Sequence, residues 1–153
     1  MKDKRPMWST PPEVFPFIAQ YAEDSYFMDL GCGQGKIMDA MRGIASRVVG
    51  IDDSPKPMYP GKLIGDFTKD YSQEIVSADV LYMWSGNPEL RLAQMVENGQ
   101  NINGVLLIGA HGKREVEFLH SSRATFVEIE EIPFKEGKDY PGGKFYVGVM
   151  LGL

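Results

Sequence analysis

The chain has 153 residues, of which 43% are hydrophobic and 24% charged. This composition supports one folded domain over residues 1–153 and excludes a disordered chain. The longest apolar runs, such as Val105 to Ala110, are far shorter than the roughly 20 residues that cross a bilayer. The charged start lacks the apolar stretch of a secretory signal. We therefore expect a cytoplasmic protein without membrane contact.

Charge and cysteine content narrow the classes of partner. Lysine and arginine number 16 against 21 acidic residues, a formal net charge of −5, whereas proteins that contact many phosphates usually present a basic face. Nucleic acid is therefore the less favoured partner, and the basic cluster at Lys2, Lys4 and Arg5 is interpreted as a solvated tail. Cys32 has no second cysteine or paired histidine to complete a disulfide or zinc site, so we expect a reducing compartment and no metal.

The first predicted element is a helix after Thr10, Pro11 and Pro12. Its apolar residues recur at helical spacing from Val14 onward. Pro16 lacks an amide donor and predicts either an irregular first turn or a regular helix that begins only near this residue.

Alternating strand and helix patterns follow and predict an α/β domain with a parallel sheet and right-handed crossovers. Five strands are expected, at Tyr26 to Asp29, Arg47 to Asp52, Lys62 to Asp66, Ala78 to Trp84, and Val105 to Ala110. One helix should follow the first strand, with Ile37, Met41, Ile44 and Ala45 on one face, and another should carry Leu92, Met95 and Val96. Three prolines between Asp53 and Gly61 predict a loop in place of the usual crossover helix.

Two further strands are predicted at the end of the chain, over Ala124 to Pro133 and Lys144 to Gly152. The segment between them contains Tyr140-Pro141-Gly142-Gly143, which favours hairpin pairing. We therefore expect an antiparallel strand to finish the sheet.

The segment Phe27-Met28-Asp29-Leu30-Gly31-Cys32-Gly33-Gln34-Gly35 lies where a buried strand ends and a helix begins. Its glycines allow a ligand close to the backbone, and free amides at the helix start suit an anionic group. The spacing is G-x-G-x-G, with Lys36 where the third glycine of a dinucleotide fingerprint would fall. Asp29 would repel a pyrophosphate and instead fits a ligand with a cationic amine.

This segment resembles the first motif of the class I, seven-strand S-adenosylmethionine-dependent methyltransferases. The resemblance implies a Rossmann-like, mostly parallel seven-stranded sheet with an antiparallel terminal hairpin strand and helices on both faces. It implies S-adenosylmethionine as cofactor, with Asp29 and the glycine loop at the methionine moiety, Asp52 at the ribose and Asp66 at the adenine. The cofactor-binding residues expected on this basis are Thr10, Asp29, Gly31, Cys32, Gly33, Gly35, Asp52, Asp53, Asp66 and Phe67.

Two features depart from the family pattern. Asp53 stands where members more often carry an apolar residue against the adenine, and it could share the ribose or lie in solvent. The proline-rich segment that replaces a crossover helix could leave that side of the pocket open.

The segment Trp8-Ser9-Thr10-Pro11-Pro12-Glu13-Val14 resembles the opening of the small protein-lysine methyltransferases of archaeal and mitochondrial type. That resemblance implies that Thr10 contacts the cofactor, and the alternative is that Thr10 caps a helix. Nucleic-acid amino methyltransferases of this fold carry [D/N]-P-P-[aromatic] after the fourth strand. The chain has Ser85-Gly86-Asn87-Pro88-Glu89 there, without the second proline or the aromatic, although Trp84 could stack on a base or form an apolar wall.

Tyr82, Met83, Trp84 and His111 are the candidate substrate-binding residues. His111 follows the fifth strand at the edge where ligands bind in such sheets, whereas His120 is read as a packing or solvent-facing residue. No catalytic residue is assigned, because an activated methyl donor needs mainly alignment and exclusion of water. We expect a methyltransferase acting on a protein lysine nitrogen. The alternatives are a nucleic-acid or small-molecule methyltransferase, and a non-catalytic cofactor-binding module or partner subunit.

Overall fold

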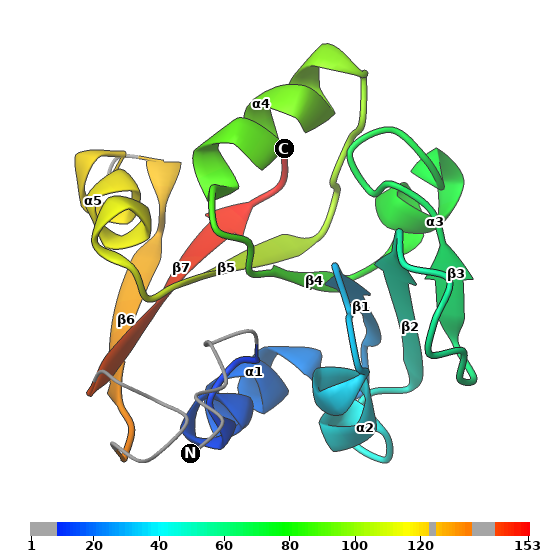
Figure 1. Ribbon diagram of the computed structural model, residues 1–153, viewed down its shortest axis with the longest axis horizontal. Coiled ribbons are helices and arrows are strands. Elements are labelled where there is room, and N and C mark those ends of the chain that lie inside the picture. The colour runs from blue at the N-terminus through cyan, green and yellow to red at the C-terminus, as the bar shows by residue number, and fades with distance from the viewer. Residues whose placement is uncertain (1–8, 123–124, 136–142) are drawn as a thin grey trace, which may run out of the picture.

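The computed structural model describes residues 9–122, 125–135 and 143–153. A seven-stranded sheet lies in the middle of the molecule, with helices on both faces (Figure 1). The predicted fold class is therefore confirmed. The predictions for Lys2, Lys4, Arg5, Trp8, Ala124 and residues 140–142 fall outside the described residues.

The strands are β1 (Tyr26–Leu30), β2 (Arg47–Asp52), β3 (Lys62–Ile64), β4 (Val80–Met83), β5 (Val105–Ala110), β6 (Glu128–Pro133) and β7 (Lys144–Leu151). The helices are the 3-10 turn η1 (Pro12–Val14), α1 (Phe15–Ala22), α2 (Lys36–Met41), α3 (Ser72–Ser77), α4 (Pro88–Glu97) and α5 (Lys113–Ser121). No helix among these is long and apolar enough to span a membrane, over the residues described.

The strand order is β3-β2-β1-β4-β5-β7-β6. The first five strands of this order pair in parallel, whereas β7 is antiparallel to both of its neighbours. The antiparallel strand thus lies inside the sheet, and β6 forms the edge. In register, Asp29 on β1 pairs with Gly50 on β2 and Tyr82 on β4. The ends of these strands therefore bring the residues that follow them to one edge of the sheet.

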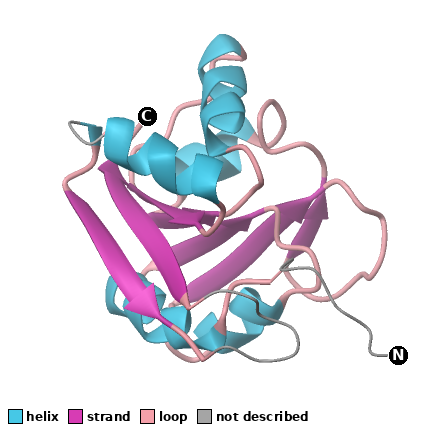
Figure 2. Cartoon of the chain, turned by 60° about the vertical axis from the view of Figure 1, so that its left-hand side comes forward, coloured by secondary structure: helices cyan, strands magenta, loops and turns pink. Residues whose placement is uncertain are grey.

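Helices lie on both faces of the sheet (Figure 2), and the buried side chains form two layers, one on each face. Helices α3, α4 and α5 pack against one face, and α1 and α2 pack against the other. Side chains alternate between the faces along each strand. Leu81 and Met83 on β4 accordingly join the first layer, while Val80 and Tyr82 join the second.

Several element bounds differ from the predictions for local reasons. Helix α1 begins beside Pro16 after an irregular turn, as expected. Helix α2 ends at Met41, because Gly43 adopts a left-handed φ of 84°, and Ile44 is left 37% exposed. Strand β3 ends two residues early, where Asp66 starts a turn. Helix α3 was not predicted, since its six residues bury only Ile75 and give no periodic pattern.

Candidate active site

Two neighbouring cavities lie at the carboxyl edge of the central strands. The larger has a volume of about 630 Å³ and the smaller about 210 Å³. The larger is lined by Ser9, Thr10, Asp29, Gly31, Cys32, Gly33, Gln34, Lys36, Ile37, Tyr82 and Trp84. The smaller is lined by Leu30, Gly31, Asp52, Asp53, Gly65, Asp66, Phe67, Trp84, Ser85 and Arg91. Gly31 and Trp84 border both cavities, so the two cavities adjoin.

The loop after β1 depends on its glycines. Gly31, Gly33 and Gly35 have φ values of 82°, 52° and 83°, which side chains of L-residues rarely adopt. The amides of Gly31 and Cys32 both donate to the carbonyl of Ile51 on β2, at 2.7 and 3.1 Å. Gly35 caps α2. The loop therefore runs close along the sheet edge and exposes its backbone to the larger cavity.

Asp29 is the most strongly perturbed acid of the site. Its side chain is only 4% exposed and lines the larger cavity. No residue in the described part of the chain donates a hydrogen bond to its carboxylate. Burial, and secondarily the charge of Asp52, raise the pKa of Asp29 from 3.8 to about 7. A buried carboxylate without donors is costly, so a cationic group in this cavity would stabilise the charged form.

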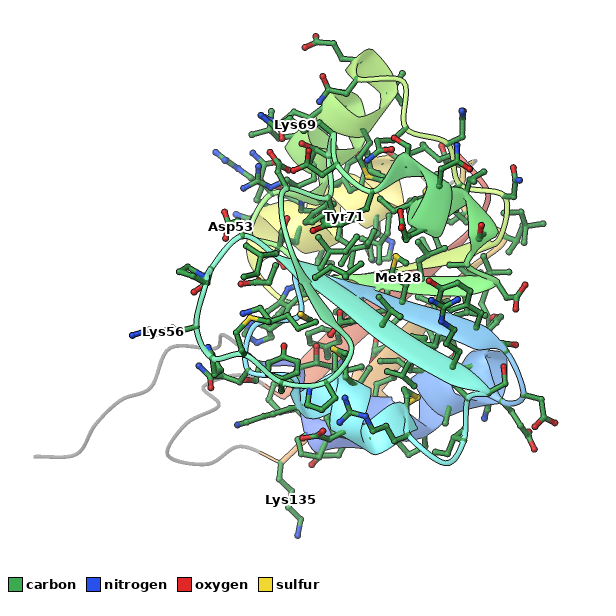
Figure 3. The ribbon with its side chains drawn as sticks, turned by 90° about the vertical axis from the view of Figure 1, so that its right-hand side faces the viewer. Met28, Asp53, Lys56, Lys69, Tyr71 and Lys135 are labelled. Atoms are coloured by element: carbon green, nitrogen blue, oxygen red, sulfur yellow. The ribbon has the colours of Figure 1, made fainter. Side chains whose placement is uncertain are left out.

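Asp52 ends β2 and connects two loops. One carboxylate oxygen accepts from the amide of Gly33 at 3.2 Å, and the other accepts from the amide of Ser54 at 3.1 Å. Each oxygen keeps further acceptor capacity toward the smaller cavity. The neighbouring Asp53 is exposed at the start of the loop between β2 and β3, and it also borders the smaller cavity (Figure 3).

Asp66 shapes the turn after β3. One of its oxygens accepts from both the amide and the hydroxyl of Thr68, at 2.9 and 2.7 Å. Burial acts to raise the pKa of Asp66, but these bonds and nearby positive charges bring it below its ordinary value. Phe67 follows, and its ring lies 3.7 Å from where a Cβ on Gly31 would be. The smaller cavity thus has an aromatic wall and a charged carboxylate side by side.

Thr10 and Tyr82 form a buried pair in the larger cavity. Their hydroxyl oxygens lie 2.7 Å apart, and both side chains are at most 5% exposed. Neither η1 nor α1 has a side-chain cap. The capping alternative for Thr10 is therefore wrong, and its hydroxyl instead joins the residues before η1 to β4. Burial raises the pKa of Tyr82 well above its ordinary value, so the phenol stays protonated.

Trp84 is held from the other side by Glu115 on α5. One carboxylate oxygen of Glu115 accepts from the indole Nε1 at 2.8 Å and from the amide of His111 at 3.0 Å. The indole also packs edge-on against Phe145, with ring centroids 5.3 Å apart. This arrangement fixes the orientation of the aromatic wall that both cavities share.

Two candidate substrate-binding residues, Met83 and His111, lie outside both cavities. Met83 is fully buried in the core, because alternation along β4 turns it to the opposite face from Tyr82 and Trp84. His111 borders neither cavity, and its ring lies 5.7 Å from that of Phe134. Of the four candidates, only Tyr82 and Trp84 therefore contribute to the cavity walls.

Sequence reasoning missed two cationic residues of the site. Lys36 borders the larger cavity, and Arg91 on α4 borders the smaller. The sequence does carry a signal for Lys36, because this residue directly follows Gly35 and must therefore lie near the loop. Arg91 lies on α4, shortly after Ser85 of the same cavity, and no motif marks it in the sequence. Among the described residues, no cluster of three or more His, Cys, Asp or Glu side chains could hold a metal ion.

Comparison with known proteins gives structural matches only. No protein-family profile and no curated protein matches the chain in sequence. A precorrin-6y C5,15-methyltransferase from Geobacter metallireducens GS-15 has a TM-score of 0.62 at 14% identity, covering 98% of this chain and 91% of its own. A TehB-like SAM-dependent methyltransferase from Corynebacterium glutamicum has a TM-score of 0.58 at 22% identity, and the match covers 93% of this chain and 88% of the other.

An rRNA methylase from Streptococcus thermophilus has a TM-score of 0.59 at 11% identity, covering 95% of this chain and 98% of its own. The three proteins cover nearly the whole chain and share its architecture. These likenesses, together with the strand order, show that the chain has the seven-stranded fold of the class I S-adenosylmethionine-dependent methyltransferases.

Proposed function

We propose that the protein is a methyltransferase that binds S-adenosylmethionine across the two cavities. The observation that carries the proposal is Asp29, a buried carboxyl with no hydrogen-bond donor among the described residues, on the wall of the larger cavity. Such a group favours a cationic ligand. The amino-acid half of S-adenosylmethionine has an ammonium group that meets this need.

The larger cavity suits the whole amino-acid half. Asp29 is available to the ammonium group, and Lys36 on the same cavity wall is available to the carboxylate. The cavity thus provides one negative and one positive side chain for the two opposite charges of the amino-acid group. This pairing also disfavours a pyrophosphate, which would place two negative charges beside Asp29.

The smaller cavity suits the nucleoside half. Asp52 can accept hydrogen bonds from both hydroxyls of a ribose diol while it keeps its bonds to Gly33 and Ser54. Phe67 provides an apolar face for a purine, and Asp66 lies beside it as an acceptor for an exocyclic amine. Because the cavities meet at Gly31 and Trp84, they accommodate a ligand with two halves joined in the middle.

Methyl transfer from an activated donor requires mainly that the protein bind and align the reactants. Bound S-adenosylmethionine supplies a methyl group on a positively charged sulfur, which is already activated for transfer. The described residues orient the reactants and exclude water, with Trp84 fixed by Glu115 and Tyr82 fixed by Thr10. Tyr82 keeps its proton, so it can donate a hydrogen bond but does not serve as the base.

We further propose a protein lysine nitrogen as the methyl acceptor. The net charge of −5 supports a basic partner and disfavours a polyanion. Asn87, the residue that a nucleic-acid amino methyltransferase would direct at its target amine, accepts from the amide of Leu90 at 3.1 Å. It caps α4, which fixes its side-chain oxygen at the start of that helix.

The test is transfer of labelled methyl groups. The full chain is incubated with radiolabelled S-adenosylmethionine and fractionated cell extract, and the label is followed into protein, nucleic acid and small molecules. Label in protein that depends on Asp29, with no transfer by Asp29→Asn, supports the proposal. Label in nucleic acid or in small molecules would move the acceptor to that class. Cofactor binding without transfer to any pool would make the protein a binding module.

A further inference from the structure

Residues 54–61, which make up most of the segment between β2 and β3, form a well-anchored loop in place of a crossover helix. We call it the proline loop. Lys62 is only 5% exposed, and its Nζ donates to the carbonyls of Ser54 at 2.7 Å and Pro57 at 2.8 Å. Arg42 donates to the carbonyl of Pro60 at 2.7 Å. Lys56, between these anchors, points away from the protein (Figure 3).

The anchored loop brings one side chain, Tyr59, onto the glycine loop. Its hydroxyl lies 2.8 Å from the carbonyl oxygen of Gly33 and 3.0 Å from Sγ of Cys32. Its ring covers Gly35, where an added Cβ would come within 2.8 Å of Cζ. The side of the site that the sequence left open is therefore packed against the proline loop.

Tyr59 itself does not line either cavity, whereas Cys32 and Gly33 line the larger one. A loop with three glycines at positive φ loses much conformational entropy when it is ordered. A contact that fixes such a loop before the ligand arrives lowers this cost of binding. Tyr59 makes such a contact from outside the cavity.

We propose that Tyr59 is a positioning residue, which holds the glycine loop in the conformation that binds the amino-acid half of the cofactor. The inference rests on the proposed function for the identity of the ligand. The contact between the two loops can also be tested without any ligand.

The first measurement compares two ligands by calorimetry on the full chain. S-adenosylhomocysteine carries both halves of the cofactor, whereas 5′-methylthioadenosine lacks the amino-acid half. Tyr59→Phe keeps the ring over Gly35 and removes only the hydroxyl. We expect this variant to bind S-adenosylhomocysteine about threefold to tenfold more weakly than the wild type does, the range for loss of one neutral hydrogen bond. Methylthioadenosine should be almost unaffected, because its contacts lie in the smaller cavity.

Tyr21→Phe is the matched control. It removes a tyrosine hydroxyl that donates to Glu128 at 2.7 Å, and Tyr21 borders neither cavity. Both affinities should stay as in the wild type. Equal affinities of Tyr59→Phe and the wild type, or an equal loss for both ligands, would overturn the positioning role.

The second measurement uses Cys32, the only cysteine of the chain, as a reporter of the contact. Burial raises the pKa of Cys32 to about 11, and the Tyr59 hydroxyl acts in the opposite direction. Loss of the hydroxyl by itself would therefore slow alkylation, because the thiolate is the nucleophile. We expect Tyr59→Leu to react with iodoacetamide several times faster than the wild type, which only greater exposure of Cys32 can explain.

An unchanged or slower alkylation rate in Tyr59→Leu would overturn the inference. If the wild type binds neither ligand, the proposed function fails, and the alkylation rates still decide whether Tyr59 holds the glycine loop. The two proposals therefore fail on different observations.

Discussion

Replacing Asp29 with asparagine should make the protein more stable above pH 7, although it removes the proposed ligand contact. Asparagine has nearly the same shape and no charge. The pKa of Asp29 rises from 3.8 to about 7 in the folded protein, chiefly through burial. At about 1.4 kcal/mol for each pKa unit, ionising this group in the fold costs roughly 4 kcal/mol of unfolding free energy.

The pH dependence follows from the sign of this shift. The folded state holds the Asp29 proton more tightly than the unfolded state, so the contribution to stability is complete below pH 3.8. It is lost as the pH rises toward 7. Relative to the asparagine variant, the wild type should therefore lose about 2.5 kcal/mol between pH 5 and pH 8.

Urea denaturation followed by tryptophan fluorescence at pH 5 and pH 8 measures this difference. Glu117→Gln is the control, because Glu117 is exposed on α5, and its effect should stay within about 0.5 kcal/mol at both pH values. The same stability gap between Asp29→Asn and the wild type at pH 5 and pH 8 would refute the reasoning. It would mean that Asp29 titrates alike in both states.

Three further predictions concern ligand binding and the pH profile. Asp52→Ala should weaken S-adenosylhomocysteine by about 1.5 to 3 kcal/mol in calorimetry, the scale for lost charge-assisted hydrogen bonds, and an unchanged affinity would move the ribose contact to Asp53. Gly33→Val should leave the circular dichroism spectrum intact and abolish binding, since the space is open but φ is 52°, and an unfolded variant would make this glycine structural. With a substrate in hand, single-turnover rates should still rise between about pH 7.5 and 9 in His111→Ala, since a lysine acceptor has a pKa near 10.4 and the histidine borders neither cavity. If the wild-type rate instead reaches a plateau from about pH 7, and the plateau disappears in His111→Ala, then His111 is the general base.

The sequence predicted the parts of the site that local rules control. Strands β2 and β5 have the predicted bounds, because their apolar runs are continuous and end abruptly. The glycine loop could be predicted because backbone positions with positive φ strongly favour glycine, which is visible in the sequence. The acids Asp29, Asp52 and Asp66 could be placed together because strand ends in a parallel sheet share one edge.

Sequence and structure differ at positions that are determined by packing between segments distant in the chain. Met83 could have been excluded, since strict alternation along β4 already separates it from Tyr82 and Trp84. The position of the His111 ring could not be predicted as readily, because it depends on two contacts with residues outside β5. Its amide donates to Glu115 on α5, and its ring lies beside that of Phe134. Tyr59 reaches the glycine loop across 26 residues from a segment without periodicity, so no pattern in the sequence marked it.

Calorimetric titration of the wild type with S-adenosylhomocysteine and with NAD tests the central claim most directly. We expect S-adenosylhomocysteine to bind, and to bind several times more tightly at pH 7.5 than at pH 6, because Asp29 with a pKa of about 7 must ionise to hold the ammonium group. NAD should give no heat of binding. Binding of NAD, or no binding of S-adenosylhomocysteine at either pH, would contradict the assignment of these cavities.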